Sequence, residues 1–281
     1  MDCMALGSAR GLDTAEFPTP ESYVEAGITS ADTAACRWNF GDRFSVQLAD
    51  DFYGRYESLL EHTPPTAICT HLRGAARIVR TARANGVPAI WFLRDIDEAY
   101  HPAHDIQETH ALGAHFMCNS KFIQRAARQR FGIEASVVYP LVDPEEYRVS
   151  NDRGACITMV NPAPAKGVST FLEVARLLPE LRFLLVESQW RLQPGFMDGL
   201  RRAVADIPNL ELLGRVRDIR TIYERTRLAL VPSIWEEPFC RVVLEVQASG
   251  IPVLASRVGG LPEALVEIGR ASCRERVCQY V

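Results

Sequence analysis

From Asp51 onward, short apolar runs alternate with longer stretches in which apolar residues recur at helical spacing. The first half of the chain contains four strand-sized runs: Thr66–Thr70, Pro88–Leu93, His115–Cys118 and Ala135–Tyr139. Helical patterns occur in the same region at Asp51–His62, at Arg73–Asn85, and from the N-cap Ser120 to Arg130. Repeated strand–helix–strand units of this length predict a parallel sheet with helices on its faces.

The polar stretch Asp143–Gly154 interrupts this pattern, and we interpret it as a linker between two domains. Beyond it, five strand-sized runs follow: Ile157–Val160, Arg182–Val186, Leu210–Leu213, Leu228–Val231 and Val253–Ala255. Helical stretches separate them: Val168–Leu178, Pro194–Asp206, Asp218–Thr226 and Arg241–Ser249. The sequence therefore predicts an α/β fold of two doubly wound, Rossmann-like domains, 1–147 and 155–266. In such sheets, ligands bind beyond the carboxyl ends of the strands.

The two ends of the chain lack both patterns. We assign no element to Met1–Phe40, which shows little periodicity. Residues 267–281 continue no helix or strand and resemble the conceptual translation of a sequencing adapter, so we predict a non-native tail there. Both domains are therefore expected to be incomplete.

The composition is that of an ordinary globular protein, with 47% apolar and 23% charged residues among 281. A net charge of −4 without any basic run argues against a nucleic-acid partner. Apolar runs such as Phe183–Val186 are far shorter than the roughly 20 residues that span a bilayer. No secretory signal pattern is visible either. We therefore expect a cytoplasmic protein. Peripheral contact with a membrane surface stays open, although no amphipathic basic helix supports it.

The eight cysteines form no C-x-x-C pair, and Cys69, Cys118 and Cys156 lie in apolar runs. This distribution favours a reducing compartment and argues against a structural zinc site. His101, His104 and His110 gather in a predicted loop, but their spacing matches no closed metal site. We therefore predict that the protein needs neither a metal nor another cofactor.

The segment Pro232–Glu245, with the sequence PSIWEEPFCRVVLE, follows a strand and enters a helix. Free backbone N–H groups at such a position can bind a phosphate. Glu237 and Glu245 are eight residues apart, about 12 Å along a helix, too far to share one proton or one metal ion. They can instead bind the two ends of an extended ligand through its hydroxyl groups. Taken alone, the same spacing also fits two solvated helix glutamates.

A second candidate site is the segment Val160–Gly167, which follows the first strand of the second half and opens a helix. Its Lys166 can neutralise a diphosphate, and the helix N-terminus would add its dipole. A lysine that simply faces water at the start of a helix is the alternative.

The segment around Glu237 and Glu245 closely resembles the E-x7-E signature of the retaining glycosyltransferases of family 4, the group 1 transferases with the GT-B fold. The likeness continues through Gly250-x-Pro252 to Gly259-Gly260-Leu261-Pro262-Glu263. It covers Cys118–Val266 well and Pro65–Asp97 loosely. The resemblance implies two Rossmann-like domains that face each other across a cleft. It also implies that Glu237 lies near the donor sugar and its reacting carbon, and that Glu245 binds the ribose.

Besides the catalytic Glu237, the resemblance implies a set of donor-binding residues: Lys166, Glu245, Asn161, Val216, Pro238, Phe239 and Cys240. Val216 ends a Leu-Gly-Arg-Val segment similar to the family loop whose backbone contacts the nucleobase. Two positions of this set depart from the family, since Asn161 stands where an arginine is usual and Cys240 where a glycine is usual. With one cation fewer, Lys166 is expected to carry more of the charge stabilisation.

In the first half, the family often has a His-Asp pair after the strand that corresponds to Pro88–Leu93, and this chain has Arg94-Asp95. The resemblance suggests Asp95 as a catalytic residue that orients the acceptor hydroxyl, and Arg94 as a site for an anionic group. An aspartate that caps a turn fits equally well. His71 follows the strand Thr66–Thr70 and is expected to face the cleft between the domains, but a structural role for it is also open. The glycine-rich first βα loop of the family is not visible.

The residues and the resemblance together predict transfer of a hexose from a nucleoside-diphosphate sugar to an acceptor hydroxyl, with retention of configuration. The acceptor stays open among glycans, lipids and small molecules. Two alternatives remain: a sugar-nucleotide epimerase of the same fold, and a non-catalytic GT-B-like binding protein.

Overall fold

The computed structural model describes residues 51–71, 74–98, 101–150, 154–187 and 194–265, together with the backbone of four strands before residue 50. The chain divides into two compact units. Unit 1 comprises Met1–Thr70, Gly74–Trp91 and Thr109–Ala114, and unit 2 comprises His71–Arg73, Phe92–Glu108 and His115–Val281. The domain boundaries 1–147 and 155–266 stay predictions. The predicted tail, 267–281, lies outside the described residues.

Unit 1 contains a four-stranded sheet in the order β1-β4-β3-β2. Its strands are β1 (Met4–Ser8), β2 (Ser30–Asp32), β3 (Arg37–Phe40) and β4 (Phe44–Ala49). β1 runs parallel to β4, whereas the other pairs are antiparallel. The sequence analysis assigned no element to Met1–Phe40, yet three of these strands lie there. Strands of three to five residues are too short to show a period, and β1 pairs with a segment far along the chain.

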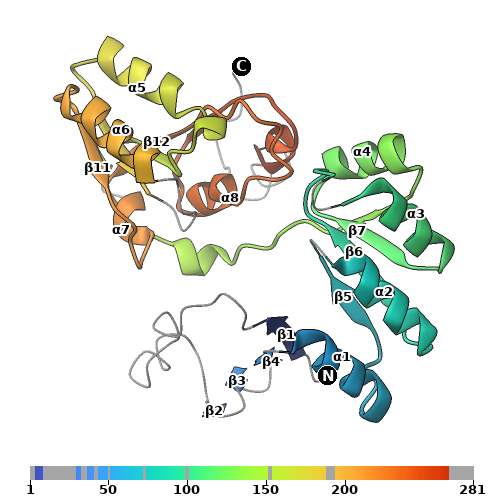
Figure 1. Ribbon diagram of the computed structural model, residues 1–281. Helices are drawn as coiled ribbons and strands as arrows, with labels where there is room; N and C mark the ends of the chain where they lie inside the picture. The colour runs from blue at the N-terminus through green and yellow to red at the C-terminus, as the bar shows by residue number, and fades with distance from the viewer. Residues whose placement is uncertain are drawn as a thin grey trace. The chain divides into compact units, whose positions relative to one another are not determined.

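A second sheet has the order β5-β6-β7-β8, and its printed pairs β5–β6 and β7–β8 are parallel. Its strands are β5 (Ile68–Thr70), β6 (Ala89–Leu93), β7 (His115–Cys118) and β8 (Ser136–Val137). The helices that connect or precede them are α1 (Phe52–His62), α2 (Ala75–Ala84), α3 (Ala103–Ala111) and α4 (Lys121–Phe131). Figure 1 labels these elements, apart from β8, along the chain.

Local chemistry explains where α4 begins and ends. The Ser120 side chain accepts a hydrogen bond from the Ile123 amide, as the predicted N-cap should. The helix ends at Gly132, whose φ of 69° lies in the left-handed region that glycine adopts at no steric cost. By contrast, the predicted loop around the three histidines was wrong, because His104 and His110 lie within α3. This helix carries few apolar residues, so its period is weak.

Unit 2 contains a five-stranded, fully parallel sheet in the order β11-β10-β9-β12-β13. Its strands are β9 (Cys156–Val160), β10 (Arg182–Val186), β11 (Leu210–Leu213), β12 (Thr226–Val231) and β13 (Val253–Ala255). The helices are α5 (Val168–Leu177), α6 (Pro194–Ala205), α7 (Arg220–Tyr223) and α8 (Arg241–Ala248). Two short 3-10 helices, η3 (Pro144–Tyr147) and η4 (Pro164–Lys166), complete this part.

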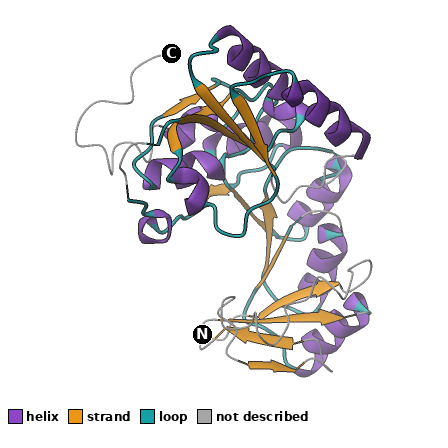
Figure 2. Cartoon of the chain, turned by 90° about the vertical axis from the view of Figure 1, so that its left-hand side faces the viewer, coloured by secondary structure: helices purple, strands orange, loops and turns teal. Residues whose placement is uncertain are grey.

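Alternating side chains of β10 supply both faces of this sheet. Phe183 and Leu185 pack against α5 and α6, whereas Leu184 and Val186 pack with Ile222 of α7 on the other face. Helices therefore cover both faces (Figure 2), as in a doubly wound sheet. The predicted α/β class with two Rossmann-like parallel sheets is confirmed. Among the helices described, none combines the length and apolar character needed to cross a bilayer.

Candidate functional site

The candidate donor site lies at the carboxyl ends of the neighbouring strands β9 and β12. The chain leaves β9 on one side to β10 and leaves β12 on the other side to β13, so the strand order reverses between them. This is the switch point at which doubly wound sheets bind ligands. Two loops meet there: 161–167 after β9 and 232–240 after β12.

An ion pair joins the two loops. The Lys166 ammonium lies 2.5 Å from each carboxylate oxygen of Glu237, and the Ser233 hydroxyl donates to Glu237 Oε1 at 2.8 Å. The Glu237 side chain is 3% exposed and that of Lys166 is 24% exposed. The ammonium also lies 5.2 Å from the centre of the Trp235 ring. The structure thus brings together two of the predicted site residues, and solvent reaches the lysine.

Close backbone packing fixes the positions of the two loops relative to each other. Gly167 has a φ of 80°, and a Cβ there would lie 1.8 Å from the Pro232 carbonyl oxygen. The amides of Ile234 and Trp235 both donate to the Ala165 carbonyl. Only glycine permits this approach at residue 167. The Lys-Gly sequence therefore has a steric reason as well as an electrostatic one.

A second glycine contact supports Glu237 from the other side. The Gly260 amide donates to the Glu237 carbonyl at 2.6 Å. A Cβ on Gly259, whose φ is 55°, would lie 2.4 Å from the same oxygen. The Gly-Gly segment noted in the sequence therefore packs directly against the backbone of the candidate catalytic residue.

Glu245 lies in α8 and has partners of its own. Its carboxylate accepts hydrogen bonds from the Tyr223 hydroxyl at 3.1 Å and from Arg241 Nε at 3.2 Å. Its side chain is 15% exposed. Burial, followed by the negative charge of Glu245, raises the pKa of Tyr223 well above its usual range. Tyr223 therefore stays protonated and acts as the donor. Neither Tyr223 nor Ser233 was predicted. Tyr223 lies 22 residues from Glu245, whereas Ser233 lies four residues from Glu237 within the motif segment, where a nearby hydroxyl was the available signal.

The remaining donor-site candidates lie in different surroundings. Asn161 has a φ of 70°, unusual for a residue other than glycine, and its buried Oδ1 has no partner among the described residues. Cys240 packs in a buried apolar cluster, and burial raises the pKa of its thiol to about 11. Phe239 lies against Tyr139, with ring centres 5.8 Å apart. Pro238 is buried, and Val216 packs beside Leu184 and Ile222.

A second polar cluster lies at the carboxyl end of β6. Asp95 Oδ1 lies 3.3 Å from Nε2 of His101, which is fully buried. Burial tends to raise the pKa of Asp95, but the hydrogen bonds from His101 and from the Asp97 amide outweigh it, so that the pKa is lowered. Burial, Arg94 and His101 together lower the pKa of His71. The structure thus pairs Asp95 with a histidine that the sequence analysis had placed in a possible metal cluster.

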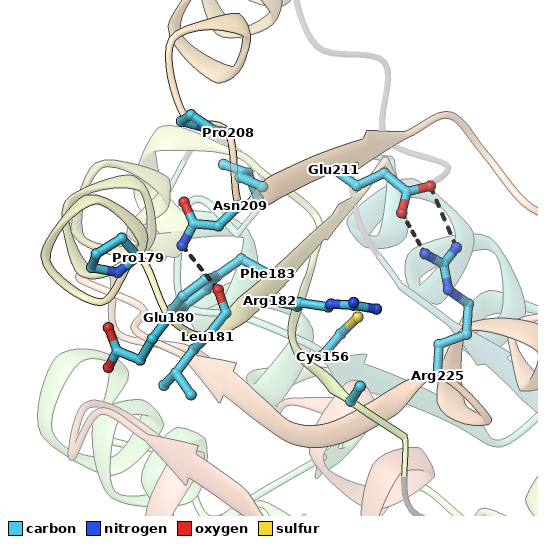
Figure 3. Close-up of a pocket in the computed structure, with 12 residues that line it drawn as sticks. Cys156, Pro179, Glu180, Leu181, Arg182, Phe183, Pro208, Asn209, Glu211 and Arg225 are labelled. Atoms are coloured by element: carbon cyan, nitrogen blue, oxygen red, sulfur yellow. Dashed lines mark hydrogen bonds and ion pairs between the residues drawn. The ribbon is translucent and has the colours of Figure 1, made fainter.

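In the part of the chain that the structure describes, no three histidine, cysteine or acidic side chains gather as metal ligands would. The expectation that no metal or cofactor is needed stays a prediction. A pocket of about 530 Å³ lies elsewhere, at the amino ends of β9, β10 and β11. Figure 3 shows its lining, where Arg225 pairs with Glu211, and Asn209 donates to the Leu181 carbonyl. This is the sheet edge opposite to the Lys166–Glu237 pair.

Residues 154–273 match the family described as glycosyl transferases group 1. The predicted resemblance to this family is confirmed. The matched segment contains every predicted donor-site residue of the group 1 signature, from Asn161 to Glu245.

Curated relatives are likewise named as glycosyltransferases. The D-inositol 3-phosphate glycosyltransferase of Mycobacterium leprae (strain Br4923) is 25% identical over 287 residues, covering 92% of this chain and 62% of the relative. The enzyme of the same name from Mycobacterium tuberculosis (strain F11) is 32% identical over 149 residues, 46% of this chain and 30% of the relative. The chain therefore spans less than two thirds of the length of these relatives.

Two solved structures show a similar fold. HepE of Anabaena in complex with UDP superimposes with a TM-score of 0.68 at 18% identity, covering 96% of this chain and 84% of that chain. A glycosyltransferase from Rickettsia africae gives a TM-score of 0.64 at 17% identity, covering 76% of this chain and 63% of that chain. At these identities the likeness shows the GT-B fold.

Proposed function

We propose that the protein transfers a sugar from a nucleoside-diphosphate sugar to an acceptor hydroxyl, with retention of configuration. The Lys166–Glu237 pair at the switch point of the parallel sheet is the observation that carries this proposal. The group 1 match, and the complexes of HepE with UDP and with UDP-glucose, support a nucleotide-sugar donor. Uridine nucleotides are therefore the first donors to test.

The chemistry assigns a separate task to each group. As the bond between the anomeric carbon and the diphosphate breaks, negative charge grows on the leaving group. Lys166 is partly exposed and can stabilise that charge, which is where preorganised electrostatics contribute most. Glu237 would then exchange its contact with Lys166 for contacts with the sugar. Glu245, held by Tyr223 and Arg241, would bind the ribose hydroxyls.

On the acceptor side, Asp95 is the candidate group that orients the attacking hydroxyl. Its lowered pKa keeps it ionised at neutral pH, so that it can accept a hydrogen bond from the hydroxyl. Arg94 is exposed beside it, which suits an acceptor with an anionic group. The curated relatives are named for D-inositol 3-phosphate, and this compound is a fitting first acceptor. We propose a cytoplasmic location; contact with a membrane surface stays a prediction.

The test is a donor screen that measures release of nucleoside diphosphate with and without an acceptor. We expect release to depend on both substrates and the product to keep the anomeric configuration of the donor. An epimer formed from the donor alone would instead establish an epimerase. Nucleotide binding by calorimetry without any turnover would establish a binding protein.

A further inference from the structure

The carboxylate of Glu263 binds the first turn of α4. The Lys121 amide donates to Glu263 Oε2, and the Phe122 amide donates to Oε1, each at 2.6 Å. The Tyr139 hydroxyl donates to Oε2 at 3.2 Å. Arg125 lies 3.9 Å from Oε1. These residues all belong to unit 2, although 142 positions separate Lys121 from Glu263.

This contact completes the cap of α4. The first amides of a helix have no partner within the helix, and the positive end of its dipole favours a carboxylate. The Ser120 side chain accepts from the Ile123 amide, and Glu263 accepts from the two preceding amides, those of Lys121 and Phe122. Such charge-assisted hydrogen bonds to backbone donors are among the stronger ones in proteins.

On one side, Glu263 is connected to the Glu237 loop. The Glu263 amide donates to the Gly260 carbonyl, and the Gly260 amide donates to the Glu237 carbonyl. Gly259 packs so tightly against Glu237 that no Cβ fits. The Tyr139 ring, whose hydroxyl binds Glu263, also contacts Phe239. Hydrogen bonds and close packing therefore connect Glu263 to the backbone that carries Glu237.

On the other side, the same helix start is connected to the Asp95 segment. Asn119, two residues before Lys121, donates through its side chain to the Arg94 carbonyl at 3.2 Å. Arg94 directly precedes Asp95. A continuous series of hydrogen bonds and short covalent steps thus runs from Glu237, through Glu263, to Asp95.

We propose that Glu263 is a positioning residue that fixes the Glu237 loop relative to the Asp95 segment. This inference rests on the proposed function, in which Glu237 serves the donor and Asp95 the acceptor. A displacement of about 1 Å in such a pair can cost about a hundredfold in rate. Glu263 contributes no atom to the reaction and acts through the positions of the other two.

Hydrogen exchange tests the connection without requiring activity. In Glu263→Ala, we expect the Gly260 amide, and not only those of Lys121 and Phe122, to exchange about tenfold faster. The control is Glu134→Ala. Glu134 is exposed and its carboxylate lies 3.1 Å from Nε of Arg128, a residue of α4, so the variant also removes an ion pair of this helix. Unchanged exchange at Gly260 would overturn the inference whatever the protein catalyses.

Kinetics test the positioning role. With turnover expressed per nucleotide-binding site, we expect Glu263→Ala to lower kcat for transfer at least about tenfold while donor KM and UDP affinity stay within about twofold. Glu263→Gln keeps one acceptor oxygen and should give an intermediate kcat. A purely structural role would lower the number of binding sites and leave kcat per site unchanged, which would overturn the inference.

The two failures can be told apart. If wild type shows no transfer with any donor, the proposed function fails, and the hydrogen-exchange result still decides whether Glu263 links the two segments. If wild type transfers sugar and Glu263→Ala does so equally well per site, the proposed function stands and the positioning role is refuted.

Discussion

The carboxyl edges of the β9–β13 sheet and of the β5–β8 sheet each hold a paired carboxylate, but the two pairs differ in which partner is the more deeply buried. In the Lys166–Glu237 pair, the carboxylate is 3% exposed and the ammonium 24% exposed. In the Asp95–His101 pair, the carboxylate is 19% exposed and the imidazole is fully buried. A ligand can therefore reach the lysine of the first pair and the aspartate of the second.

This difference suggests how each pair works. Lys166 covers Glu237, so a diphosphate that attracts the ammonium would release the carboxylate for the sugar. At Asp95 the His101 partner is fully buried, so it would stay in place and hold the carboxylate for the proposed acceptor. The first pair would exchange partners on binding, whereas the second would stay fixed. The predictions below test this contrast.

The largest effect should follow from Glu237→Gln. The amide keeps the size of the side chain but loses the charge that pairs with Lys166, and we expect turnover to fall about a hundredfold or more. UDP affinity should stay the same or rise, because Lys166 is no longer neutralised. Steady-state kinetics and calorimetry measure both quantities. Glu236→Gln is the matched control, since Glu236 is exposed one residue away. Equal turnover in both variants would refute the role of Glu237.

A steric change in the same loop should come next. Gly167→Ala places a Cβ against the Pro232 carbonyl in a left-handed backbone, which should cost roughly 2–4 kcal/mol. A lower melting temperature by scanning calorimetry would show this cost. Gly199→Ala is the control, because Gly199 lies within α6, with no atom within 4 Å of its Cβ position. That variant should be stabilised by roughly 0.5–1 kcal/mol. A melting temperature for Gly167→Ala as high as that of wild type would contradict the close approach.

The two sheet edges also differ in how far the sequence could predict them. At the β9–β13 sheet, β10, β11 and β13 have the predicted bounds, and the motif singled out Glu237 and Lys166. Local patterns suffice there because these strands are largely apolar, as in β10 with the sequence RFLLV. Tyr223 could not be predicted, because it lies 22 residues from Glu245 and in another element. Ser233 lies only four residues from Glu237, but an irregular loop has no period that would place its hydroxyl against the carboxylate.

At the β5–β8 sheet the sequence was less informative. Asp95 was selected only by analogy with the family, and its partner His101 was taken for part of a loop. Both residues lie in the irregular segment after β6, where no pattern of apolar residues could predict their contact. Glu263 is a similar case: the sequence analysis included it in a motif but could assign it no function. Its partners lie 142 and 141 residues away.

Glu245→Ala should have a smaller effect than the changes in the Lys166–Glu237 loop. The variant loses the carboxylate proposed to bind the ribose, and a charge-assisted hydrogen bond contributes about 1.5–3 kcal/mol. We therefore expect UDP to bind at least about tenfold more weakly, measured by calorimetry. Tyr223→Phe removes only the hydroxyl that holds Glu245 and should weaken binding less. Wild-type affinity in Glu245→Ala would remove this residue from the donor site.

The smallest effect concerns the fixed pair at Asp95. Its pKa lies below the ordinary value of 3.8 despite burial, because His101 and the Asp97 amide bind the ionised form. A lowered pKa stabilises the fold above the ordinary value, and this contribution is lost as pH falls through the lowered value. Asp95→Asn should therefore melt below wild type at neutral pH, and the difference should shrink in acid.

The difference at neutral pH should be a few degrees at most, because pairs of partly exposed groups contribute roughly 1 kcal/mol or less. Melting curves of both proteins across the acid range measure it. Asp97→Asn is a suitable control, since the Asp97 backbone amide that binds Asp95 is retained. A difference between wild type and Asp95→Asn that does not change with pH would mean that the charge of Asp95 contributes nothing to the fold. The contrast between a fixed pair and an exchanging pair would then rest on Lys166 and Glu237 alone.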